Sequence, residues 1–165
     1  DGLQQLPAYL QSDEVFWLME RDPQLTLGNV LLAVATLQAE GKLRPADASA
    51  LADIRKEWGV AWKKKAEREF TARLRQWSHY LAELADKPKQ HALYYASEVR
   101  PRVLLQLLGE EAPELADKVQ ALDTALRPLV QPADFLWDAK LADAFPAPAY
   151  WFLRITPKLP DEDEK

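Results

Sequence analysis

The chain has 165 residues, and none of them is cysteine. This absence excludes disulfide bonds, thiolate metal sites and a cysteine nucleophile. It does not indicate a compartment, because both reducing and oxidising compartments tolerate a cysteine-free chain. Long apolar runs are absent as well: the longest, residues 30–37, is interrupted by Thr36, whereas a membrane-spanning helix needs roughly 20 apolar residues. We therefore expect no membrane span.

Glycine and histidine are scarce. Five glycines leave little room for phosphate-binding loops, and the Gly-x-Ser-x-Gly pattern of serine hydrolases does not occur. His79 has Glu83 one helical turn away and His91 is the only other histidine, but the inward Glu-x-x-His pairs of helical di-iron sites are missing. We predict a non-enzymatic protein with no catalytic residue, no metal site and no cofactor.

The remaining composition is that of an ordinary soluble protein. Hydrophobic residues make up 48% of the chain and charged residues 28%, which suffices for the core of one domain. The start of the chain lacks the basic and apolar pattern of a signal peptide. We expect a cytoplasmic protein. A removed N-terminal signal is left open, because the chain begins with Asp1 rather than methionine.

One stretch, from about residue 46 to residue 86, predicts a helix much longer than its neighbours. Its apolar residues recur at helical spacing in two groups, Leu51, Ile54, Trp58 and Trp62, then Phe70, Leu74, Trp77, Leu81 and Leu84. The phase slips between the groups, where the charged run 63–69 offers almost nothing to a core. We expect two packed halves joined by a solvated helical bridge or by a kink near Gly59, since glycine weakens a helix.

Shorter helices are predicted on either side, over the ranges 13–20, 27–39, 89–108, 113–127 and 133–144. Thr26 is the expected N-cap of residues 27–39, Gly41 should end that helix, and its dense apolar residues predict burial on more than one side. Pro101 predicts a kink or restart at residues 98–100, after which the chain should return antiparallel along the long helix. No strand pair is evident.

The last twenty residues differ in character. Four prolines bracket Tyr150-Trp151-Phe152-Leu153, and the chain closes in the acidic run 161–165. We expect an extended arm that inserts its aromatic side chains, followed by a disordered tail. The predicted fold is all-α: an irregular bundle of about six helices around the kinked helix 46–86. Residues 1–145 would form one domain of two sub-halves sharing that helix, and 146–165 the arm and tail.

Charge is distributed unevenly along the chain. Acids outnumber bases by 8 to 3 up to Asp53, bases lead by 12 to 6 from Arg55 to Gly109, and acids lead again by 12 to 6 from Glu110 onward. The basic centre, together with nearby aromatic residues, is the candidate partner-binding surface. Its predicted members are Lys63, Lys64, Lys65, Arg68, Arg73, Arg75, Tyr94, Tyr95, Arg102 and Trp151.

Three functions fit these patterns. The leading hypothesis is an interaction or scaffold protein that forms a homodimer or binds a protein partner, because the long helix exceeds its neighbours and the arm carries aromatic residues. The alternative is binding of single-stranded nucleic acid, in which basic residues neutralise phosphates and aromatic rings stack on bases. The acidic flanks could instead cover the basic helix. A second alternative is a helical sensor with a small molecule or metal bound between the halves.

Overall fold

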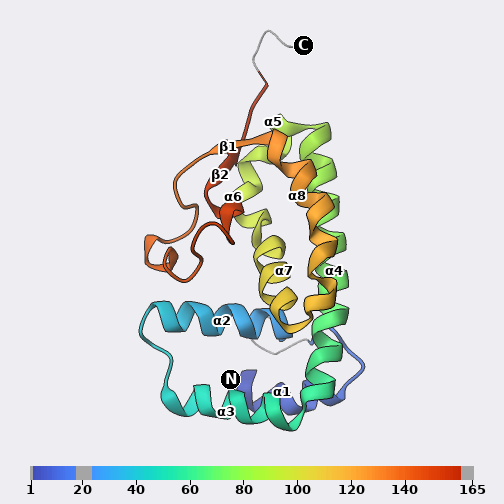
Figure 1. The fold of residues 1–165 in the computed structure, drawn as a ribbon, viewed down its shortest axis with the longest axis vertical. Coiled ribbons are helices and arrows are strands. Elements are labelled where there is room, and N and C mark those ends of the chain that lie inside the picture. Colours follow the sequence, from blue (N-terminus) through green and yellow to red (C-terminus); the bar gives the residue numbers. More distant parts are fainter. Residues whose placement is uncertain (1, 18–23, 161–165) are drawn as a thin grey trace.

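The computed structural model describes residues 2–17 and 24–160. Within these ranges the fold is all-α, as predicted, with one short two-stranded ladder (Figure 1). The α-helices are α1 (Gly2–Gln11), α2 (Leu27–Ala39), α3 (Pro45–Glu57), α4 (Gly59–Asp86), α5 (Pro88–His91), α6 (Tyr95–Glu98), α7 (Arg100–Glu111) and α8 (Gln120–Leu126). The strands are β1 (Val130–Pro132) and β2 (Ile155–Pro157). The described part of the chain contains no helix long and apolar enough to cross a membrane.

The stretch 46–86 is two helices that meet at a corner. The backbone of Trp58 leaves the helical region (φ −108°, ψ 32°), so that α3 ends at Glu57 and α4 begins at Gly59. This confirms the kink predicted near Gly59. Figure 1 shows α3 running across the foot of α4 instead of continuing its axis.

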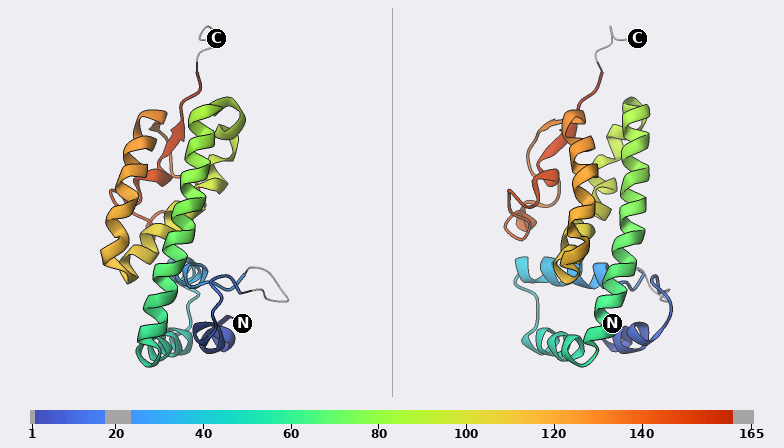
Figure 2. Two further views of the ribbon diagram at one scale, coloured as in Figure 1. Left: turned by 90° about the vertical axis from the view of Figure 1, so that its right-hand side faces the viewer. Right: turned by 45° about the vertical axis from the view of Figure 1, so that its right-hand side comes forward.

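Two lobes share α4, which runs through both of them (Figure 2). We call α1, α2, α3 and residues 59–73 of α4 the N-terminal lobe, and the rest of the described chain the C-terminal lobe. As predicted, the chain restarts after Glu98, with Pro101 in the first turn of α7, and α7 returns antiparallel along α4. The predicted helix 113–127 is a 3-10 helix (Pro113–Val119) followed by α8.

The C-terminal segment completes the core of the C-terminal lobe. Phe152 is fully buried, and its carbonyl oxygen accepts a hydrogen bond of 2.7 Å from the Tyr95 hydroxyl. Strand β2 pairs antiparallel with β1, with Gln131 opposite Thr156. The expected insertion of the arm's aromatic side chains is confirmed, whereas the expectation of no strand pair is wrong. The acidic run 161–165 lies outside the described residues.

Two predicted helices are wrong. Residues 13–17 form bends and a bridge between Trp17 and Leu25, while residues 18–20 of that prediction lie outside the described ranges. The first helix is α1 instead; it tolerates Pro7 and buries Leu6. The predicted helix 133–144 does not form, since the Leu136 amide donates to the carbonyl of Leu153 in the C-terminal segment. Only a 3-10 turn, Ala139–Leu141, remains in that described stretch.

Helix α2 has the predicted ends but not the predicted burial. The Thr26 hydroxyl accepts from the Asn29 amide at 3.0 Å, and Gly41 ends the helix with a positive φ of 68°. Within α2, however, full burial is confined to Leu27 and Gly28, at its first turn. The prediction that α2 is buried on more than one side is therefore wrong, because its apolar residues beyond the first turn stay partly exposed.

Candidate functional site

Lys65 is a buried anchor and does not belong to the predicted exposed surface. The residue is 3% exposed, and its ammonium donates to the Ser12 carbonyl at 2.8 Å and to the Glu14 carbonyl. The same ammonium lies 4.6 Å from the centre of the Tyr9 ring. Burial, and next the charge of Arg68, lowers the pKa of Lys65 below its ordinary value. Lys65 thereby fixes the segment after α1 against α4.

Glu69 and Arg73 form a second buried anchor, at the start of α2. One Glu69 oxygen accepts from the Gly28 amide at 2.8 Å, and the other accepts from Arg73 Nε at 3.1 Å. A carboxylate at this end of α2 also complements the positive end of the helix dipole. Gly28 permits this close approach, since a Cβ there would lie 2.5 Å from a Glu69 oxygen and the carboxylate would have to shift. Arg73 is therefore buried, contrary to prediction.

These anchors correct the predicted solvated bridge at 63–69. The buried positions of α4 follow an unbroken helical spacing when charged residues are included: Trp62, Ala66, Glu69, Arg73, Trp77 and Tyr80. The phase slip inferred from apolar residues alone is therefore absent from α4. Helical phase is the signal that could have placed Glu69 and Arg73 in the interior.

Arg102 and Tyr95 are also buried, in the C-terminal lobe. The Arg102 guanidinium donates twice to the Asp123 carboxylate, at 2.9 and 3.0 Å, and lies 4.2 Å from the centre of the Phe152 ring. Trp151 is partly buried, and the Arg127 guanidinium lies 3.9 Å from the centre of the Trp151 ring. The prediction that Arg102 and Tyr95 present a surface to another chain is thus corrected, since both are buried among this chain's own residues. Trp151 keeps part of its surface exposed, so its contact with another chain stays a prediction.

Five predicted members remain exposed: Lys63, Lys64, Arg68, Arg75 and Tyr94. Their spacing places Lys64, Arg68 and Arg75 on one face of α4, whereas Lys63 pairs with Glu114 at 3.4 Å. Tyr94 is 58% exposed, on the turn between α5 and α6, while its neighbour Tyr95 faces inward, as expected of adjacent helical residues. The structure thus brings together three cations but not the predicted ten-residue surface.

The aromatic residues expected beside the basic helix do not accompany these cations. Trp62, Trp77, Tyr80 and Tyr95 are all buried. The partly exposed rings near these cations are instead Trp58, which lines a cavity together with Lys64 and Arg68, and Phe16, whose ring centre lies 5.1 Å from the Arg73 guanidinium. The predicted aromatic partners of the basic helix are therefore replaced by two others, and binding of single-stranded nucleic acid stays a prediction.

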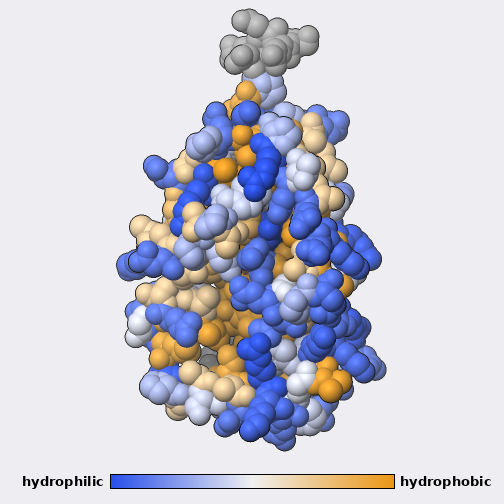
Figure 3. Space-filling model, in the orientation of Figure 1, coloured by the Kyte–Doolittle hydropathy of each residue, from blue (hydrophilic) through white to orange (hydrophobic). Residues whose placement is uncertain are grey.

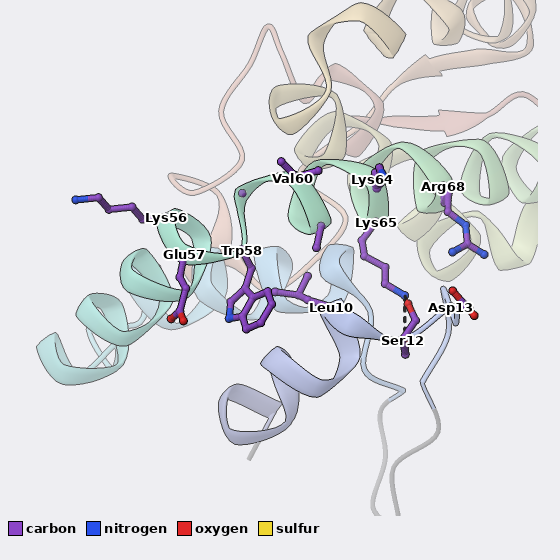
Figure 4. A pocket seen from close by; sticks show the side chains of 12 residues that line it. Leu10, Ser12, Asp13, Lys56, Glu57, Trp58, Val60, Lys64, Lys65 and Arg68 are labelled. Carbon is purple, nitrogen blue, oxygen red and sulfur yellow. Dashed lines mark hydrogen bonds between the residues drawn. The ribbon is translucent and has the colours of Figure 1, made fainter.

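The corner between α3 and α4 holds a cavity of about 610 Å³ (Figure 4). Six of its twelve lining residues are charged. The Trp58 ring and Leu10 form an apolar floor, Lys65 reaches to Ser12, and Lys56 extends away from the cavity. Lys65 is already bound by backbone oxygens, so that its charge is not free to hold a ligand.

A second cavity, of about 540 Å³, lies between α2 and α3 and is mainly apolar. We call it the α2–α3 groove. From α2 it is lined by Val30, Ala33, Val34 and Leu37, and from elsewhere by Leu3, Gln4, Lys42, Leu43, Arg44, Asp47 and Leu51. Figure 3 shows hydrophobic residues at the surface of α2 and between α2 and α3. The four α2 positions have the i, i+3, i+4, i+7 spacing of a helix-packing face.

The charges on the rim of the α2–α3 groove are paired within the chain. Lys42 lies 3.1 Å from Glu40, and Arg44 lies 2.9 Å from Asp47. The rim therefore carries no net charge from these four residues. Sequence reasoning missed this site, although the apolar density of residues 30–37 was the signal: it predicted burial by this chain where the structure leaves an open face.

The described residues contain no cluster of three or more metal-ligating side chains that could hold a metal ion. Glu83 lies between the two histidines, 2.9 Å from His79 Nε2 and 3.6 Å from His91 Nδ1. This contact links the end of α4 to α5.

Comparison with known proteins adds no relative from which a role could be transferred. No protein-family model matches the chain, and neither the curated proteins nor the solved structures include a significant match.

Proposed function

We propose that this protein is a non-enzymatic interaction module, and that it binds the apolar face of a partner's amphipathic helix in the α2–α3 groove. The observation that carries the proposal is the partly exposed apolar face of α2, formed by Val30, Ala33, Val34 and Leu37. On either side of the groove, α2 packs against α4 and α7, and α3 packs against α1 and α4. The face between α2 and α3 is left for another segment.

A helix suits the shape and the chemistry of this groove. Helix-in-groove recognition uses apolar anchors at i, i+3, i+4 and i+7, the same spacing that α2 presents. Seven of the eleven lining residues are apolar, and the rim cations are paired with acids of this chain. We therefore infer that the bound face of the partner is uncharged. Burial of apolar area, at about 25 cal/mol per Å², would supply the driving force.

A second copy of the chain fits the groove less well. A symmetric dimer joins the same surface on both copies, and two concave grooves do not fill each other. The C-terminal arm, one of the two reasons for expecting a homodimer, packs on its own core through Phe152. Self-association and a cytoplasmic location stay predictions; light scattering on the purified protein measures the first.

Peptide selection tests the proposal. A displayed library of helical peptides, with apolar residues at i, i+3, i+4 and i+7 and random residues elsewhere, would be selected against the protein. Binding of the selected peptides would then be measured by calorimetry with Val34→Asp, which places a charge in the groove, and with the control Val60→Asp, at a residue 74% exposed outside the groove.

We expect Val34→Asp to weaken binding at least tenfold, about 1.4 kcal/mol, and Val60→Asp to leave it within twofold. Equal binding by both variants, or a selection that yields no binder, would contradict the proposal. Retention of peptide by the basic face of α4 would appear instead as sensitivity to Arg68→Glu and to salt.

A further inference from the structure

We propose that the width of the α2–α3 groove is controlled at the α3–α4 corner. Glu111 holds this corner closed, and release of its contact with Arg55 lets α3 pivot at Trp58 and widen the groove. The biological meaning of this motion rests on the proposed function, but the motion itself is measured without any partner.

Helix α3 is the wall of the groove that is held most lightly. All 13 of its residues remain at least partly exposed, whereas α4 and α7 each bury several side chains fully. Its apolar contacts come from the partly buried side chains of Leu51 and Ile54. Elements with few buried apolar contacts open at low cost, and hinges form at residues that end helices. Trp58, with its non-helical backbone, is such a residue.

Three side chains from three helices hold the corner. We call Arg55 of α3, Trp62 of α4 and Glu111 of α7 the corner clasp. The same Glu111 oxygen accepts from the Arg55 guanidinium and, at 3.1 Å, from Trp62 Nε1. The Arg55 guanidinium also lies 5.5 Å from the Trp62 ring centre. The Glu111 side chain is 9% exposed and that of Arg55 is 55% exposed. Water can therefore compete with Glu111 for the Arg55 guanidinium.

The corner clasp connects α7, which is well packed, to α3, which can rotate about Trp58. Glu111 is the last residue of α7, next to the fully buried Ala112. Arg55 lies three residues from the pivot at Trp58, whereas the groove residues Leu51 and Asp47 lie roughly 10 and 16 Å from it at 1.5 Å per residue. A small rotation at the corner therefore moves the groove wall more than it moves Arg55.

The opposite wall does not follow this rotation. Helix α2 is anchored at its first turn by the Gly28–Glu69 hydrogen bond and packs against α7. Asn29 adds a contact, since its side-chain oxygen accepts from Arg100 of α7. Movement of α3 alone thus changes the distance between the two walls.

The absence of cysteine permits a direct measurement. Nitroxide labels would be placed through Gln38→Cys on α2 and Ser49→Cys on α3, both exposed and outside the groove lining. Their distance distribution would be measured by pulsed electron resonance in the otherwise unchanged protein, in Arg55→Gln and in Glu111→Gln. The matched control is Lys56→Gln, the exposed neighbour of Arg55, which makes no ion pair among the described residues.

We expect Arg55→Gln and Glu111→Gln to broaden the distribution toward longer distances, and Lys56→Gln to leave it unchanged. A rotation of about 15° at Trp58 displaces residue 49 by roughly 3–4 Å at this lever length, which the method resolves. A reference pair in the C-terminal lobe, Ser78→Cys with Thr124→Cys, should not change. Unchanged 38–49 distances in both clasp variants would overturn the inference.

Salt provides a second measurement in case a variant loosens the whole fold, which the reference pair would reveal. Salt screens an exposed ion pair, so that 1 M NaCl should broaden the 38–49 distribution of the unsubstituted clasp, and a constant distribution would overturn the inference. No peptide takes part in either measurement. Failure of peptide binding and failure of the clasp are therefore separate results.

Discussion

In the C-terminal lobe, the inward face of α4 presents Trp77, Tyr80 and Leu84 to an apolar and aromatic interior. In the N-terminal lobe the inward face adds three buried charged residues, Lys65, Glu69 and Arg73, to the apolar Trp62, Ala66 and Phe70. Trp77 and Tyr80 stack with their ring centres 5.8 Å apart. The charged residues instead hold backbone groups of distant segments, such as the Ser12 carbonyl and the Gly28 amide.

Buried charges and apolar side chains determine the shape of a lobe in different ways. Apolar packing rewards burial in many arrangements, whereas a buried charge is stable only where its hydrogen-bond partners meet it. The N-terminal lobe therefore combines its apolar interior with well-defined charged anchor points, and α2 beyond its anchored first turn remains partly exposed. The α2–α3 groove is a consequence of this construction.

The largest expected effect separates two tryptophans. Trp77 is fully buried in the C-terminal lobe, and its Nε1 has no hydrogen-bond partner among the described residues. Trp77→Ala should lower the free energy of unfolding by about 3–5 kcal/mol, and Trp58→Ala, at the partly exposed corner, by about 1 kcal/mol. Urea denaturation followed by circular dichroism measures both. Equal losses would mean that the lobes do not differ in packing.

The anchor at Glu69 should come next. Glu69→Ala leaves Arg73 buried without its carboxylate and the Gly28 amide without its acceptor, at a cost of about 3 kcal/mol. The control Glu57→Ala removes an exposed carboxylate from α3 and should cost less than about 0.5 kcal/mol. Hydrogen exchange should show the loss first in α2. Faster exchange confined to α7 would contradict the assigned role of Glu69.

The smallest expected effect is a pH dependence in the C-terminal lobe. Burial, and next the charge of Glu110, raises the pKa of Tyr150 from 10.0 to about 12. The unfolded chain releases this proton near pH 10 while the folded protein retains it, so stability falls as the pH rises from 10 toward 12.

When the pH is raised from 8 to 11, the free energy of unfolding of Tyr150→Phe should therefore fall by about 1 kcal/mol less than that of the unsubstituted protein. Denaturation at the two pH values measures the difference, and the variant at pH 8 gives its baseline. An identical loss in both proteins would show that Tyr150 ionises alike in the folded and unfolded states.

Local signals in the sequence predicted the features that depend on neighbouring residues. The cap at Thr26, the left-handed end at Gly41, the break near Gly59 and the restart at Pro101 were all found, because each follows from the conformational limits of one or two residues. The helix expected at 133–144 failed for the opposite reason. Its backbone bonds to residues 153 and 154, which lie close only after folding.

The candidate site was harder to predict for a related reason. A charged residue in a helix normally faces water, so Lys65, Glu69 and Arg73 were assigned to a surface. Their hydrogen-bond partners lie up to 53 residues away along the chain, and no local sequence pattern predicts such distant contacts. The exposed face of α2 was not predicted either, since the apolar pattern of a helix indicates a packing face but not whether the same chain covers it.

The three consecutive lysines at 63–65 allow opening of the N-terminal lobe to be measured by chemical modification. A reagent that acylates amines should modify Lys63 and Lys64 at once, because both are exposed, and should spare Lys65, whose ammonium is enclosed by backbone oxygens. Lys65 becomes reactive only when the segment after α1 detaches from α4. Its rate of modification, read by mass spectrometry against its two neighbours, would report how often the N-terminal lobe opens.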